Sequence, residues 1–282
     1  MRKAISRKKS DPSLFRTIQL GDTLAHIVSA GLLDIGSPGR AFTLPEPSSL
    51  DATRNLFVDQ NVLVFECKNR IAIFETGVED ISGGGPNLLT RTLATAGFSA
   101  NAINAVIPTH PHLDHIGGLM TPAGNHMFPN ASIHLHPFDV SFWLSDDRLG
   151  TRSERSALVA RRQLTPNLGR LVFHTDEDET FPGVIAMHTP GHTVGHTSFV
   201  VGTGRSALFV VGDLVHHECQ LAFPSMTMLF DTDREQGVDT RIKILRYLAD
   251  KAIPALFYHL PFPGVGYVER AGEAFRFVPL GE

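Results

Sequence analysis

Cysteine is scarce in this sequence. Its 282 residues include two cysteines, Cys67 and Cys219, and neither belongs to a pair with CxxC spacing. A disulfide framework needs several cysteines, and redox or zinc-ribbon sites need the close pair. The sequence therefore excludes these classes, and we expect both thiols to be buried and reduced.

Long apolar runs and an excess of positive charge are also absent. No segment approaches the roughly 20 apolar residues that a membrane-spanning helix requires. The formal net charge is -4, which gives no long-range attraction for nucleic acid. We therefore expect neither a membrane span nor a nucleic-acid partner. The basic run at residues 1–12 is not followed by an apolar stretch of signal-peptide length, so a cytoplasmic location is expected.

What remains is the composition of a globular protein with a packed core. Hydrophobic residues make up 42% and charged residues 19% of the chain. The runs 61–67 and 70–76 predict a hairpin, and loops are predicted at the Pro-rich stretch 43–49 and the Gly-rich stretch 83–86. Further strands are predicted at 105–108, 132–136, 184–188, 198–201, 207–211 and 255–258, and helices at 87–96, 137–144, 153–164 and 239–249. Hairpins mixed with βα units favour an α/β layered fold.

Histidine is abundant, and it gathers where predicted strands end. The chain has 14 histidines, and the strand predicted at 105–108 is followed by Thr109 and then by the segment HPHLDH at 110–115. At a strand end, His110 and His112 can direct two imidazoles at one point, because residues two apart share a face. The following turn lets Asp114 and His115 face a second point. Imidazole and carboxylate without thiolate suit zinc, iron or manganese and argue against a purely structural zinc site.

The HPHLDH segment resembles the HxHxDH signature of the metallo-β-lactamase superfamily. Three later features follow in that family's order: a Gly-His-Thr turn at His192, an aspartate at a strand end, Asp213, and a late histidine, His259. The resemblance extends over about residues 55 to 280. It implies a four-layer αββα sandwich with two mixed β-sheets. We expect a single domain, in which residues 1–50 form an N-terminal extension with the first strands and 51–282 the hydrolase domain.

The same resemblance implies a site for two divalent metal ions. The first ion would bind His110, His112 and His192, the second Asp114, His115 and His259, and Asp213 would bridge both. Zinc is expected, with iron, manganese or cobalt as alternatives, because availability decides among metals with these ligands. A bridging hydroxide is the expected nucleophile.

Several neighbours would orient the ligands. His196, Thr193 and Glu75 are the candidates, because a metal-bound imidazole needs a partner on its other nitrogen. Ordinary loop hydrogen bonding is the alternative for each. Glu75 stands where the family usually has aspartate, and its extra methylene requires the usual contact to be rearranged.

The segments after Asp213 resemble the methyl parathion hydrolase-like and lactonase-like group. They are GDLVHH at 212–217, FDTD at 230–233 and HLPFPGVG at 259–266. This resemblance implies hydrolysis of an ester-like bond in a small molecule, with a lactone or a carboxyl or aryl ester first and an organophosphate triester second. A β-lactamase, an iron-dependent redox enzyme and a non-catalytic sensor module are further alternatives, because a fold does not name a substrate.

Catalytic and pocket residues can also be nominated. Asp114 is expected to pass a proton to the leaving alkoxide while it binds its metal. His216 falls where related lactonases place a tyrosine against the substrate carbonyl, and a surface histidine is the alternative. Aromatic residues would wall an apolar pocket, or else serve as ordinary core residues: Trp143, Phe262, Phe138, Phe223 and Phe230. A homodimer contact through the first 50 residues is a further expectation.

Overall fold

The computed structural model describes residues 14–20, 23–44, 50–51, 53–78 and 88–281, and within them the strands form two seven-stranded sheets. Several predicted features lie outside these residues: the basic run 1–12, the loop 83–86, the first residue of the helix 87–96 and residues 45–49 of the Pro-rich stretch. In both sheets the spatial order of strands follows their order in the chain, so each half of the sequence builds one sheet.

Both sheets are mixed. The first is antiparallel from β1 to β4 and parallel from β4 to β7. Its strands are β1 (Phe15–Leu20), β2 (Thr23–Gly36), β3 (Leu56–Cys67), β4 (Arg70–Phe74), β5 (Ala105–Val106), β6 (Ser132–Leu135) and β7 (Leu171–Phe173). The second is antiparallel except for the parallel pair β11 and β12. Its strands are β8 (Glu179–Phe181), β9 (Val184–His188), β10 (Thr197–Val201), β11 (Leu208–Gly212), β12 (Ala255–Phe257), β13 (Val265–Ala271) and β14 (Ala274–Pro279).

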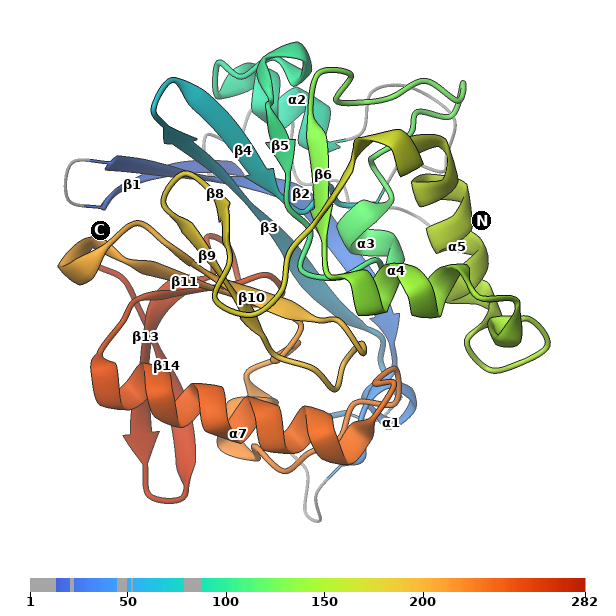
Figure 1. Cartoon of the computed structure of the whole chain (residues 1–282). Coiled ribbons are helices and arrows are strands. Elements are labelled where there is room, and N and C mark those ends of the chain that lie inside the picture. The colour runs from blue at the N-terminus through green and yellow to red at the C-terminus, as the bar shows by residue number, and fades with distance from the viewer. Residues whose placement is uncertain (1–13, 21–22, 45–49, 52, 79–87, 282) are drawn as a thin grey trace.

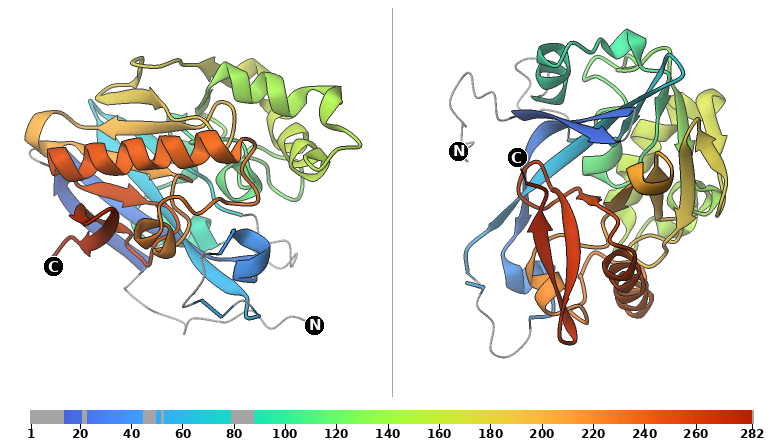
Figure 2. Two further views of the ribbon diagram at one scale, coloured as in Figure 1. Left: turned by 90° about the horizontal axis from the view of Figure 1, so that it is seen from below. Right: turned by 90° about the vertical axis from the view of Figure 1, so that its left-hand side faces the viewer.

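Helices cover the outer face of each sheet (Figures 1 and 2). Helices α2 (Leu88–Thr95), α4 (Pro137–Leu144) and α5 (Glu154–Leu164) pack on the first sheet. Helix α7 (Arg234–Lys251) packs on the second. Shorter elements complete the chain: α1 (Pro38–Ala41), α3 (Leu113–Ile116), α6 (Cys219–Ala222), and the 3-10 turns η2 (Ala100–Ala102), η3 (Asp146–Arg148), η4 (Thr165–Arg170) and η5 (Gly204–Ser206).

Alternating side chains explain why the two sheets stack between helices. On β4, Ile73 faces the helices of the first sheet, whereas Phe74 faces the second sheet. On β11, Val210 faces the first sheet, whereas Val211 packs toward α7. All four side chains are at most 4% exposed, as the two-residue period of a strand requires when both faces are covered. The predicted αββα sandwich is confirmed.

The predicted strands agree with the structure within one or two residues, except that β3 begins at Leu56 rather than at residue 61. Helix α7 also starts earlier than expected. It begins at Arg234 rather than at residue 239, because the carboxylate of Asp233 accepts a hydrogen bond from the backbone N–H of Gln236 and caps the helix. No residue ranges were predicted for six strands: β1, β2, β7, β8, β13 and β14.

Strands β1 and β2 belong to the first sheet, where β2 pairs with β3. The N-terminal region thus contributes to the same sheet as the later chain. The single-domain organisation and the dimer contact through residues 1–50 remain predictions. Among the described helices, none combines the length and apolar character needed to cross a bilayer.

Candidate metal centre

Imidazoles and carboxylates from both sheets meet at one end of the sandwich. Three groups of side chains have ligand atoms that lie within 4.8 Å of one another. The first group is His110, His112 and His192; the second is Asp114, His115, Asp213 and His259; the third is His192, Asp213 and His216. The structure therefore brings together all seven residues that were predicted to bind metal, and adds His216 to them.

Strand ends deliver these residues. His110 follows β5, and His112 caps the one-turn helix α3, on which Asp114 and His115 lie. The turn after β9 carries His192. Asp213 directly follows β11, and the loop after β12 carries His259. The first two residue groups therefore each draw side chains from both sheets.

The first group is a set of imidazole nitrogens that face each other. Nδ1 of His112 lies 2.9 Å from Nε2 of His110 and 2.9 Å from Nε2 of His192. A neutral imidazole carries a single N–H, so three converging nitrogens cannot all be satisfied by hydrogen bonds among themselves. Burial, followed by the neighbouring histidines, lowers the pKa of His110 and His112 and keeps them neutral. Their lone pairs are therefore available to a cation.

Asp213 stands between the two groups. Its Oδ2 lies 3.4 Å from Nε2 of His192, and its Oδ1 lies 3.2 Å from Nε2 of His115 and 3.3 Å from Nε2 of His259. The two oxygens of one carboxylate thus face two different sets of imidazoles. A carboxylate in this position can bridge two cations.

Negative charge is concentrated around the second group. Oδ2 of Asp114 lies 3.3 Å from Nε2 of both His115 and His259. Burial lowers the pKa of His259, but Asp213 and Asp114 outweigh burial and raise it to about 10. Within the described chain, Oδ2 of Asp114 and Oδ1 of Asp213 form no directed hydrogen bond. Buried carboxylates need a compensating positive charge, so this donor set fits a divalent metal ion.

Glu75 occupies the position predicted for an orienting residue. Its Oε2 lies 2.9 Å from Nδ1 of His115, on the opposite side of the ring from the nitrogen that faces Asp213. Its Oε1 accepts the backbone N–H of Thr109, whose hydroxyl lies 3.0 Å from Nδ1 of His110. The longer side chain therefore reaches both the second group and the strand end that carries the first.

His196 acts on the backbone of Asp213. Its Nε2 accepts the backbone N–H of Asp213 at 3.0 Å, and its Nδ1 lies 3.1 Å from the carbonyl oxygen of Thr189. Burial lowers the pKa of His196 to about 3, so the ring stays neutral and can accept. Gly212 permits this approach, because it has a φ of +65° and a Cβ there would lie 2.6 Å from Nε2 of His196.

Two buried carboxylates support the site without having been singled out from the sequence. Oδ1 of Asp231 lies 2.7 Å from Nδ1 of His192. Asp139 accepts the hydroxyl of Thr193 at 2.8 Å, and burial raises the pKa of Asp139 to about 7. The FDTD segment was a signal for Asp231, but it was used only to recognise the group that the chain resembles.

His216 is buried beside the cluster, 2% exposed, and is not a surface histidine. Its Nε2 lies 3.1 Å from Oδ2 of Asp213, and its ring stacks on that of His259 at 5.4 Å between centroids. Nδ1 has no hydrogen-bond partner within the described residues. The backbone N–H donates to Oε1 of Gln220 at 2.7 Å, which holds the segment in place.

The five predicted pocket residues are distributed unevenly. The Trp143 ring lies 5.2 Å from that of His112, edge to face. Within the described part of the chain, the other four have no ring contact with a metal-binding residue. Phe138, Phe223 and Phe230 are 60%, 42% and 52% exposed. Phe262 is partly buried against the core between the sheets. Trp143 itself is 3% exposed and belongs to the core under the first sheet's helices. A substrate-binding role for all five residues remains a prediction.

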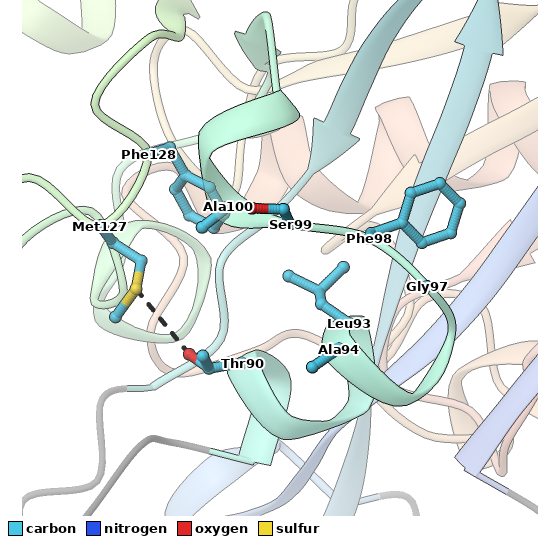
Figure 3. A pocket seen from close by; sticks show the side chains of 9 residues that line it. All are labelled: Thr90, Leu93, Ala94, Gly97, Phe98, Ser99, Ala100, Met127 and Phe128. Carbon is cyan, nitrogen blue, oxygen red and sulfur yellow. Dashed lines mark hydrogen bonds between the residues drawn. The ribbon is translucent and has the colours of Figure 1, made fainter.

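A separate cavity lies between α2 and the loops that follow it. It measures about 390 Å³, and its walls include Thr90, Leu93, Phe98 and Phe128 (Figure 3). None of its lining residues belongs to the metal-binding groups. Its wall contains no ionisable side chain, so we assign it no part in the chemistry of the centre.

Comparisons with known proteins agree with this geometry. The sequence profile of the metallo-beta-lactamase superfamily matches residues 56–255. An N-acyl homoserine lactonase from a Bacillus species is 28% identical over 118 residues, which are 42% of this chain and 40% of that protein. The chain thus spans less than half the length of the curated lactonases that it matches.

Two solved structures share the fold over nearly the whole chain. The hydrolase AbOPH, in the beta-lactamase superfamily, has a TM-score of 0.86 at 21% identity and covers 97% of this chain and 99% of its own. AidC, a dizinc quorum-quenching lactonase in complex with the product N-hexanoyl-L-homoserine, has a TM-score of 0.84 at 25% identity and covers 96% and 99%. The shared fold therefore includes residues outside 56–255, the region that the profile matches.

Proposed function

The chain belongs to the metallo-β-lactamase superfamily, and we propose that it is a two-metal hydrolase of ester-like bonds whose first substrate class is lactones. The observation that carries this proposal is the placement of Asp213, whose two oxygens face two different groups of imidazoles. Lactonases among both the sequence relatives and the structural neighbours support the choice of bond.

We assign the ligands by the groups that the side chains form. One cation would be held by His110, His112 and His192, the other by Asp114, His115 and His259, with Asp213 shared. We propose zinc for both, because the donors are nitrogen and oxygen atoms alone and AidC is a dizinc enzyme. When bound, two such cations supply Lewis acidity and lower the pKa of water toward neutrality.

The surrounding side chains have defined tasks in lactone hydrolysis. The reaction consumes one water, forms a bond from its oxygen to the acyl carbon and breaks the bond from that carbon to the ring oxygen. Asp114 can move the water proton to the departing alkoxide, because its side chain is 12% exposed and thus more accessible than those of His115, His259 and Asp213. His216 can donate to the carbonyl oxygen through a ring nitrogen, since Nδ1 has no partner within the described residues.

The apolar part of the substrate would enter beside His112, which is the partly exposed member of the first group. The ring of Trp143 packs at that position. An aromatic wall next to a polar centre suits an acyl chain or aryl group.

The test is turnover of three substrates before and after chelation. N-hexanoyl homoserine lactone, p-nitrophenyl acetate and paraoxon would be compared, with zinc content measured in parallel. We expect two zinc ions per chain, fastest turnover of the lactone, loss of activity with 1,10-phenanthroline and recovery on adding zinc. Preference for paraoxon would move the substrate class to phosphotriesters. Activity that survives both chelation and Asp213→Ala would refute a metal-dependent hydrolase.

A further inference from the structure

Asp139 is a fully buried carboxylate on α4 whose three side-chain hydrogen bonds go to residues outside the metal-binding groups. It is 0% exposed and accepts three hydrogen bonds. The hydroxyl of Thr193 donates to Oδ2 at 2.8 Å, and the backbone N–H of Gly195 donates to Oδ1 at 3.0 Å. The indole Nε1 of Trp143 donates to Oδ1 at 3.2 Å. One side chain thus joins helix α4 to the turn that carries His192.

The turn is shaped to receive this carboxylate. A Cβ at Gly195 would lie 2.7 Å from the backbone nitrogen of Asp139 and 2.8 Å from its Cγ. Real side chains do not approach so closely, so only glycine lets the turn settle against the helix. The second glycine of the segment GHTVGHT therefore serves contact with Asp139.

Two of the three hydrogen bonds of Asp139 lead to imidazoles of the first group. Thr193 directly follows His192, whose Nε2 faces His112 at 2.9 Å. The Trp143 ring packs against that of His112, with ring planes at 69°. Asp139 thus holds both Thr193, the neighbour of His192, and Trp143, which packs on His112.

The second group is supported by other residues. Nδ1 of His259 lies 2.9 Å from the carbonyl oxygen of Asp59, and Glu75 contacts His115. The hydroxyl of Tyr258 donates to the carbonyl oxygen of Asp114 at 2.6 Å. No hydrogen bond of Asp139 described above leads to these residues. Loss of Asp139 should therefore affect one metal position and not both.

We propose that Asp139 is a positioning residue for the metal position formed by His110, His112 and His192. The inference rests on the proposed two-metal function. Removing the carboxylate leaves a buried hydroxyl and two buried N–H groups without acceptors, which lets the His192 turn and Trp143 shift. Metal-ligand geometry is sensitive to such supports, and their loss typically lowers metal affinity about 10- to 100-fold.

The experiment compares zinc binding by Asp139→Ala and Asp139→Asn. Stepwise affinities would be measured by competition with a chromophoric chelator, and folding by circular dichroism and thermal unfolding. We expect Asp139→Ala to bind one zinc ion as the wild type does and the other about 10- to 100-fold more weakly. Asp139→Asn should bind both nearly normally, because an amide oxygen can still accept from Gly195 and Trp143.

Asn167→Ala is the matched control. Asn167 is also fully buried, donates to the carbonyl oxygen of Gln163 and accepts from Arg170, but contacts no residue of the metal-binding groups. This variant should lose thermal stability and still bind two zinc ions with wild-type affinity. An equal loss of zinc affinity in Asn167→Ala would overturn the inference, because general destabilisation would then explain the result.

Thr193→Val decides the matter should Asp139→Ala not fold. It removes one of the three donors to Asp139. We expect the affinity for one zinc ion to fall by at least about threefold, which is less than the roughly 10- to 100-fold loss typical when such a support is removed completely. In a His110→Ala background, which disables the first group, the remaining zinc should be insensitive to Thr193→Val. Wild-type affinity for both ions in folded Asp139→Ala, or in Thr193→Val, would overturn the role of Asp139. Failure of the wild type to bind two zinc ions would instead refute the proposed function.

Discussion

Oδ1 of Asp231 lies 2.7 Å from Nδ1 of His192, on the edge of the ring opposite the Nε2 that faces His112. A carboxylate in this position keeps the proton on Nδ1 and leaves the lone pair of Nε2 free for a metal. The two residues are 39 positions apart. The loop before α7 thus determines the tautomer of a histidine that follows a strand.

Asp231→Ala should weaken zinc binding and lactone turnover by about 10- to 100-fold, because His192 loses both its orientation and its fixed tautomer. Zinc competition and kcat/KM would measure the two effects. Asp233→Ala is the matched control: it removes the cap of α7, which costs about 1 kcal/mol of stability, and should leave zinc affinity unchanged. Equal zinc affinities in Asp231→Ala and wild type would contradict this account of His192.

Glu75→Asp should be harmful although it restores the residue usual in the superfamily. The shorter side chain cannot reach Nδ1 of His115 while it also accepts the N–H of Thr109, and both contacts are made in this chain. We expect kcat/KM to fall about tenfold, at the lower end of the range for residues that orient metal ligands. Steady-state kinetics with measured zinc content would test this. Wild-type kinetics in Glu75→Asp would mean that the contact with His115 does not matter.

Stability should depend on pH through buried histidines away from the metal centre. Burial, followed by His136 and His134, lowers the pKa of His174 to about 3. Between that value and the ordinary value of 6.5, the unfolded chain binds a proton that the folded chain does not. The free energy of unfolding should therefore fall as the pH falls through this window, by at most about 1.4 kcal/mol per pH unit for this one group.

His174→Gln removes that titration. Urea unfolding between pH 7 and pH 4 should give a shallower pH dependence for this variant than for the wild type. Burial raises the pKa of Asp139 to about 7, so this carboxyl group makes the free energy of unfolding rise as the pH falls. The effect of His174 is therefore read from the difference in pH dependence between the variant and the wild type. Identical slopes would show that His174 binds its proton in the folded state as readily as in the unfolded state.

Phe199→Ala should be among the costly core substitutions. Phe199 is 0% exposed between the sheets and packs edge to face on Phe74 at 5.5 Å. Removing a buried phenyl ring typically costs about 3–5 kcal/mol. Phe57→Ala, at a residue 48% exposed on β3, should stay within about 0.5 kcal/mol. Urea denaturation of both variants would measure the difference. Similar losses in the free energy of unfolding would show that the buried ring of Phe199 contributes no more to stability than an exposed one.

The positions of the metal-binding residues were readable from the sequence because buried strands are continuous apolar runs. The runs before Asp213 and His259 end directly at those residues, and the run before His110 ends two residues earlier, at Pro108, so each polar side chain lies close to a strand end. The fold places such ends together, and the spacing HPHLDH adds a one-turn helix that separates Asp114 from His112. Local pattern and resemblance were therefore sufficient to bring the seven side chains together in the prediction.

The supporting contacts could not be predicted in the same way. Asp139 and Thr193 are 54 positions apart, and nothing in either local sequence indicates that they meet. Their contact depends on how α4 lies on the first sheet and how the turn after β9 approaches it. The aromatic residues illustrate the same limit, because Phe230 is next to Asp231 in sequence yet is 52% exposed.

Each half of the chain builds one sheet, and the first two metal-binding groups take side chains from both. Any ion bound there is a cross-link between the halves. Each bound cation, present at a thousand times its dissociation constant, would add about 4 kcal/mol to the free energy of unfolding. A fragment ending before β8 would keep His110 and His112 but lack His192, so tight metal uptake would report the reassociation of two separately produced fragments.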